Sequence, residues 1–89
     1  MTIDTAAAGS DLLRMINRSV SLDPSIQVDM DTDLLLTGLV DSLGVIEIVT
    51  FLEKKHDVEI DVLDVVIENF QTPSRMLALV DRLRAAGDE

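Results

Sequence analysis

The spacing of apolar residues along the chain predicts helices packed against one another. Residues 10–20 begin with Ser10, a residue type favoured at helix N-caps, and carry Asp11 in the first turn. The apolar positions that follow lie at helical spacing: Leu12, Leu13, Met15, Ile16 and Val20. We therefore expect a helix over residues 10–20, preceded by a flexible N-terminal leader at residues 1–9.

The strongest helical pattern runs from Ser42 to Lys55. At 100° per residue, one stripe about 100° wide collects four apolar side chains: Val45, Ile48, Val49 and Leu52. Leu43 and Ile46 project to the opposite half, where the neighbouring side chains are polar: Glu47, Thr50 and Glu53. Apolar residues on an otherwise polar face indicate contact with a partner.

The remaining segments complete a small all-α four-helix bundle, with three longer helices and a short third one. Residues 21–40 form a long connection, from which Leu34-Leu35-Leu36 is expected to fold back onto the core. The apolar run after residue 60 predicts the short helix, around Val65–Asn69. Thr72-Pro73 is a helix start signal, and the last helix should end near Ala86-Gly87. The expected domain spans residues 10–86, with a C-terminal tail at 87–89.

Composition and charge exclude several classes of function. The 89 residues fit one domain, and the absence of cysteine excludes disulfides and thiolate chemistry. Seventeen acidic against seven basic residues give a net charge of −10, which opposes binding to nucleic acids and to anionic membranes. No apolar run approaches the roughly 20 residues of a membrane span, and no secretion signal is visible. We expect a cytoplasmic protein.

The acidic residues are concentrated in one part of the chain. Seven of them lie between Val20 and Glu53, where there is no Lys or Arg. This distribution is compatible with ordinary solvation and with a docking surface for basic partners. Asp29-x-Asp31-x-Asp33 imitates the start of a calcium loop, but the Gly and Glu that such a loop needs are missing, which favours a solvated acidic loop.

Two residues, His56 and Ser42, are candidates for a chemical role, and each can also be explained by a structural role alone. His56 is the only histidine, so it forms no recognisable zinc site, and its place near a helix C-terminus favours a partly protonated imidazole. Ser42 stands where the long connection enters a helix, and taken alone such a serine is an N-cap. No G-x-S-x-G motif supports a nucleophile activated within this chain.

The segment around Ser42 resembles the acyl carrier and peptidyl carrier proteins. The likeness is carried by the sequence GLVDSL at 38–43, and continues through 44–49, 52–55, 58–60 and 68–72, so that it covers about residues 10–86. The Gly38-x-x-Asp41-Ser42 spacing is similar to that of discrete carriers, including D-alanyl and aminoacyl carriers and those of polyketide and nonribosomal pathways.

The resemblance implies a four-helix bundle with Ser42 at the start of the second helix. Ser42 would receive 4′-phosphopantetheine from coenzyme A through a magnesium-dependent phosphopantetheinyl transferase, with Asp41 assisting recognition by that transferase. The thiol of this arm would hold acyl, aminoacyl or polyketide intermediates as thioesters. Partner enzymes would contact a surface on the second helix: Leu43, Ile46, Glu47, Thr50 and Glu53.

Together these implications describe a free-standing, monomeric carrier protein that is not itself an enzyme. It would be loaded by an adenylating ligase or an acyltransferase and would deliver its cargo to downstream synthases or transferases, in a specialised pathway of the polyketide or nonribosomal type. Two alternatives stay open. One is a carrier of fatty-acid synthesis; the other, from a different class, is an unmodified helical adaptor in which Ser42 only caps a helix.

Overall fold

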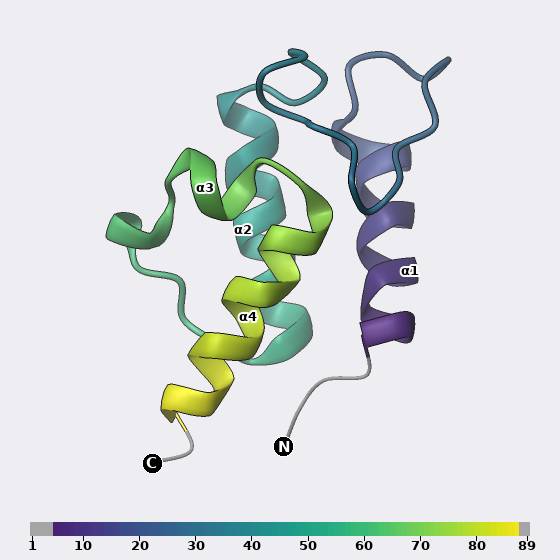
Figure 1. Ribbon diagram of the computed structural model, residues 1–89. Helices are drawn as coiled ribbons and strands as arrows, with labels where there is room; N and C mark the ends of the chain where they lie inside the picture. The colour runs from purple at the N-terminus through teal and green to yellow at the C-terminus, as the bar shows by residue number, and fades with distance from the viewer. Residues whose placement is uncertain (1–4, 88–89) are drawn as a thin grey trace.

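The computed structural model describes residues 5–87, which form helices joined by loops (Figure 1). Within this range there is no strand, so the predicted all-α four-helix bundle is confirmed. The elements in chain order are α1 (Thr5–Met15), a π-helical turn η1 (Ile16–Val20), α2 (Ser42–His56), a 3-10 turn η2 (Val62–Asp64), α3 (Ile67–Phe70) and α4 (Pro73–Gly87). None of the described helices is long and apolar enough to cross a membrane.

The first helix starts earlier than its sequence signals predicted. It begins at Thr5, so the expected N-cap Ser10 lies inside the helix, and residues 5–9 of the predicted leader are helical. The three consecutive alanines at 6–8 explain this, because alanine has the highest helix propensity. Ala8 is also buried in the core. Residues 1–4 of the predicted leader lie outside the described residues, and the helical path continues through η1 to Val20, as predicted.

The core is mainly aliphatic and draws on every described helix except the turn η2, which has no buried residue. Its fully buried members include Leu12 and Ile16 from the first helical stretch, Ile48 and Leu52 from α2, and Val80 from α4. Further buried side chains come from the loop and from the short helix, among them Val28, Leu34 and Phe70. Of the predicted trio 34–36, only the first side chain is fully buried, while Leu36 is exposed.

The predicted third helix is displaced. The structure has η2 at Val62–Asp64 and α3 at Ile67–Phe70 in place of one helix around Val65–Asn69. The Asp61 carboxylate accepts a hydrogen bond from the Leu63 backbone N–H at 2.9 Å and fixes the earlier turn. Val66 is then extended (φ −125°, ψ 159°), a conformation that β-branched residues favour, so the helix restarts only after it.

The last helix follows its start signal. Pro73 is its first residue, and the hydroxyl of Thr72 accepts a hydrogen bond from the Arg75 backbone N–H at 3.3 Å, as an N-cap does. The helix runs to Gly87, the first residue of the predicted tail, and residues 88–89 lie outside the described part of the chain.

His56 is buried at the C-terminal end of α2, and its imidazole is harder to protonate than the position along the helix indicated. Burial, followed by the nearby cations Arg84 and Lys55, lowers the pKa of His56 below its ordinary value of 6.5, while Asp11 acts weakly in the opposite direction. The expected partly protonated imidazole is therefore wrong, because desolvation and positive neighbours outweigh the helix dipole.

This burial predicts a loss of stability on mild acidification. Because the folded-state pKa of His56 is lowered, the unfolded chain binds the proton more readily, and the free energy of unfolding falls as the pH drops below about 6.5. Urea unfolding from about pH 7.5 to about pH 5.5 should show this fall in the wild type and a smaller one in His56→Phe. An identical fall in both proteins would contradict the assignment to His56.

Candidate functional site

The N-terminus of α2 is capped by Asp41, and Ser42 is the first residue of the helix. The Gly44 backbone N–H donates a hydrogen bond to Asp41 Oδ1 at 2.9 Å, and Asp41 itself has extended backbone angles. The prediction that Ser42 taken alone is the N-cap is therefore wrong. Asp and Ser are both good caps, and the aspartate, one residue earlier, occupies the position.

The side chain of Ser42 is exposed and uncommitted. No described residue exchanges a hydrogen bond with Ser42 Oγ, so the hydroxyl is free to react. It lies at the N-terminus of a 15-residue helix, where unpaired backbone N–H groups and the helix dipole favour a negative charge. This position suits a phosphodiester attached at the oxygen.

Gly44 allows the preceding loop to pack tightly against the first turn of α2. A Cβ atom at Gly44 would lie 2.7 Å from Val40 Cγ1 and 3.5 Å from Val20 Cβ. Both valines are buried, so their side chains have little room to move away. The absence of a side chain at Gly44 thus holds the loop close to Asp41 and Ser42.

We expect the effect of Gly44→Ala on the free energy of unfolding to depend on the residue at position 40. In the wild type the new methyl group strains the contact with Val40, which costs about 1–3 kcal/mol and cancels or exceeds the gain in helix propensity of about 1 kcal/mol. In a Val40→Ala background the strain is removed, and the same substitution should raise the free energy of unfolding. Urea denaturation of the four proteins gives this cycle, and additive effects would contradict it.

The outward face of α2 carries the apolar side chains predicted there. Leu43 and Ile46 are 71% and 61% exposed, and Glu47 and Thr50 are exposed beside them. The Thr50 hydroxyl donates a hydrogen bond to the Ile46 carbonyl at 3.1 Å within the helix. Glu47 has no hydrogen-bond or ion-pair partner among the described residues, which leaves its carboxylate available to another molecule.

Most of the acids between residues 20 and 53 hold the backbone in place. Five of the seven accept hydrogen bonds from backbone N–H groups: Asp23, Asp29, Asp33, Asp41 and Glu53. In Asp33 the hydrogen bond from Gln71 is the main cause of a lowered pKa. Glu53 Oε2 accepts the Ile60 N–H at 2.9 Å, so this predicted partner residue also fastens the chain after α2. The loop is therefore more than a solvated acidic segment.

The sequence reading missed a second exposed apolar surface, on η2 and α3. Val62 and Leu63 are 80% and 82% exposed, and Ile67 is more than half exposed. Residues 57–70 contain five acids and no Lys or Arg. The sequence signal for this surface was an apolar run that lacks the spacing of a core helix and is surrounded by acidic residues. The turn fixed by Asp61 leaves these side chains outside the core.

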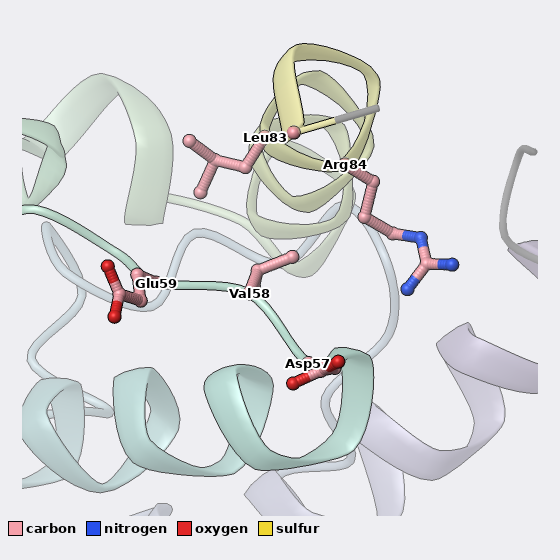
Figure 2. A pocket seen from close by; sticks show the side chains of 6 residues that line it. Asp57, Val58, Glu59, Leu83 and Arg84 are labelled. Atoms are coloured by element: carbon pink, nitrogen blue, oxygen red, sulfur yellow. The ribbon is translucent and has the colours of Figure 1, made fainter. Parts of the chain in front are cut away.

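A hollow lies at the other end of α2, away from Ser42. It measures about 490 Å³ and is lined by Asp57, Val58, Glu59, Leu83, Arg84 and Gly87 (Figure 2). At 1.5 Å per helical residue, it is roughly 20 Å from Ser42. Arg84 is held beside it by a hydrogen bond from Nη1 to the His56 carbonyl at 2.6 Å. The described residues contain no group of three or more side chains arranged to hold a metal ion.

Comparison with known proteins places most of the chain in one family. The family model described as "Phosphopantetheine attachment site" matches residues 10–80. The D-alanyl carrier protein of Leuconostoc citreum (strain KM20) is 29% identical over 77 residues, which are 86% of this chain and 96% of that protein.

Proposed function

Because this chain belongs to the phosphopantetheine attachment family, whose members carry a covalently attached 4′-phosphopantetheine, we propose that Ser42 is the residue that bears it and that the arm holds an acyl or aminoacyl thioester. The observation that supports Ser42 is its exposed hydroxyl, which has no hydrogen-bond partner among residues 5–87, on the first residue of α2 directly after the capping residue Asp41.

The attachment itself requires a second protein. A bond forms between Ser42 Oγ and the phosphorus next to the pantetheine of coenzyme A, the pyrophosphate bond breaks, and 3′,5′-ADP leaves. The hydroxyl proton goes to a base of the transferase, because no described residue lies in hydrogen-bond contact with Ser42 Oγ. Asp41 contributes by fixing the first turn of α2 and by presenting a carboxylate beside the hydroxyl for recognition.

The proposals for the cargo and the pathway have less support than the proposal for the attachment residue. The similarity to a D-alanyl carrier protein favours an aminoacyl or small acyl cargo, activated by an adenylating ligase and passed to a downstream transferase or synthase. A specialised pathway of the polyketide or nonribosomal type remains part of the proposal. The unmodified adaptor loses its main support, because the capping role that it assigned to Ser42 belongs to Asp41.

The docking surface for these enzymes combines the outward face of α2 with η2 and α3. Leu43 and Ile46 supply exposed apolar area on α2, and Val62 and Leu63 supply it on η2. Glu47 adds a negative charge that no described residue pairs with. A partner with an apolar depression rimmed by Lys or Arg would complement this surface.

Charge reversal at Glu47 should weaken this docking. We expect Glu47→Lys to lower the kcat/KM of the loading ligase or the transferase by about tenfold at low salt, with a smaller effect in about 0.5 M salt because exposed charges are then screened. Asp81→Lys, an equal change of charge on α4, serves as the control. Glu53→Lys is a poor substitute, since it also breaks the hydrogen bond to Ile60. Equal rates for wild type and Glu47→Lys would contradict the proposed surface.

The experiment that tests the proposed function is an intact mass spectrum of the protein after incubation with coenzyme A, Mg²⁺ and a broad-specificity phosphopantetheinyl transferase. A gain of one phosphopantetheine group, followed by peptide mapping to Ser42, supports the proposal. No gain by folded protein, while a known carrier is modified in the same reaction, overturns it.

A further inference from the structure

Two exposed arginines on the first helical stretch have no partner among the described residues. Arg14 lies on α1 and Arg18 on η1, and neither forms an ion pair or hydrogen bond there. The other three arginines are all engaged: Arg75 with the Glu68 carbonyl, Arg82 with Asn69, and Arg84 with the His56 carbonyl. In a chain with seventeen acids and seven bases, unpaired arginines need an explanation.

Both arginines border a groove between the first helical stretch and α2. The groove measures about 320 Å³, and its apolar lining comes from the half-buried Met15 and Phe51. Lys55 lines it from α2, where its Nζ pairs with Asp11 Oδ2 at 3.1 Å. A second hollow of about 410 Å³ is also lined by Arg14 and Arg18, so the two side chains stand between two depressions. Three cations against one acid make this groove locally positive in a protein of net charge −10.

We propose that this groove is a second docking surface, which binds an acidic amphipathic helix of a protein partner. Guanidinium groups pair with carboxylates in bidentate geometry, and the two arginines are one helical turn apart. The apolar lining offers contact to an aliphatic side chain on the same face of the incoming helix, and a groove between two helices accepts a third helix. The π-helical turn that carries Arg18 is a feature frequent at functional sites.

The net charge of the molecule disfavours the other anionic molecules that could occupy the groove. A net charge of −10 repels nucleic acids and anionic membranes at long range, and it repels a second copy of this chain equally. A short acidic segment with an apolar face meets the local positive charge and fills the apolar lining at the same time. A protein helix is therefore the occupant that the groove fits.

The groove lies away from Ser42 and Ile46 but adjoins Glu47. On α2, Phe51 lies about 140° around the helix axis from Ile46 and about 40° from Glu47, so the groove borders one edge of the outward face. A partner in the groove leaves Ser42 and Ile46 accessible. Such a partner would keep the carrier tethered while the arm visits an enzyme, which raises the effective concentration of the thioester. This inference goes beyond the proposed function and does not depend on modification of Ser42.

The test uses the full chain and a synthetic probe. The probe is a helical peptide of about 14 residues with two glutamates four positions apart and leucines on the same face, and its control is a scrambled peptide of equal composition. NMR titration of the ¹⁵N-labelled protein should move signals of residues 11–19 and 51–55. Arg14→Glu/Arg18→Glu should weaken binding by about tenfold, whereas Lys54→Glu/Arg82→Glu, the same change of charge outside the groove, should weaken it by less than about twofold.

Several results would overturn this inference. They are no binding of the probe, equal binding of the scrambled peptide, equal losses in the two double variants, signal changes confined to residues 43–50 or 62–67, or binding to phosphatidylglycerol vesicles at the same arginines in preference to the peptide. Circular dichroism of each variant verifies that it is folded. Ser42→Ala should bind the probe as the wild type does, so that failure of the groove and failure of the attachment site are distinguishable.

Discussion

Ser42→Ala is expected to abolish attachment of phosphopantetheine and to leave the fold almost unchanged. The substitution removes the oxygen that we propose forms the new bond to phosphorus, so every later thioester step should be lost with it. Stability should change by only a few tenths of a kcal/mol, since replacements away from caps and cores have small effects. The cap of α2 stays in place, because it is the Asp41 carboxylate that accepts the Gly44 N–H.

The measurement pairs intact mass spectrometry with urea unfolding, and two variants serve as controls. Ser19→Ala removes another exposed serine and should be modified as fully as the wild type. Asp41→Ala should lose about 0.5–2 kcal/mol of stability as a lost cap, and it should be modified more slowly. Modification that persists in Ser42→Ala, or a large loss of its stability, would show that the roles of these two neighbours are reversed.

The elements best predicted from the sequence are those whose signals are local. The apolar stripe over 42–55 predicted α2 to within one residue, and Thr72-Pro73 marked the start of α4 correctly. The outward position of Leu43 and Ile46 followed from helical angles alone and is confirmed by their exposure. In these segments one pattern with one period decided the structure.

The elements predicted poorly depend on choices between competing local signals. Ser10 and Asp11 are a good cap pair, yet the three alanines before them extend α1 to Thr5. Near Val65 the β-branched residues and the cap at Asp61 divide the expected helix into η2 and α3. Local rules name the candidates at such places, but packing of the whole chain selects among them.

The sequence names the residues of the candidate site but does not reveal the hydrogen bonds between them. Asp41 and Ser42 were identified together, whereas which of them caps α2 depends on the Gly44 N–H and on the close approach of Val40. The hydrogen bond between Asp33 and Gln71 joins residues 38 positions apart, and no local pattern reveals it. From the sequence, the acidic stretch between Val20 and Glu53 is therefore interpreted as an exposed surface, although most of its carboxylates also accept hydrogen bonds that stabilise the backbone.

The short helix α3 has one buried side chain, Phe70, and Phe70→Ala should show how much α3 depends on it. A four-residue helix has little stability of its own, so α3 persists because Phe70 is inserted into the core at 1% exposure. Truncating a buried phenylalanine costs about 3–5 kcal/mol, a large part of the 5–15 kcal/mol that stabilises a typical domain. We expect a strongly lowered urea midpoint and weaker docking of partner enzymes at the proposed surface that includes Val62 and Leu63.

Phe51→Ala is the matched control, because Phe51 is the other aromatic residue of the chain and is only half-buried on α2. Its truncation removes less buried area and leaves no enclosed cavity, so the loss should be less than half of that for Phe70→Ala. Phe70→Leu should recover most of the stability and most of the docking, since a large apolar side chain again fills the space. Equal losses for the two alanine variants would show that α3 is held by contacts other than Phe70.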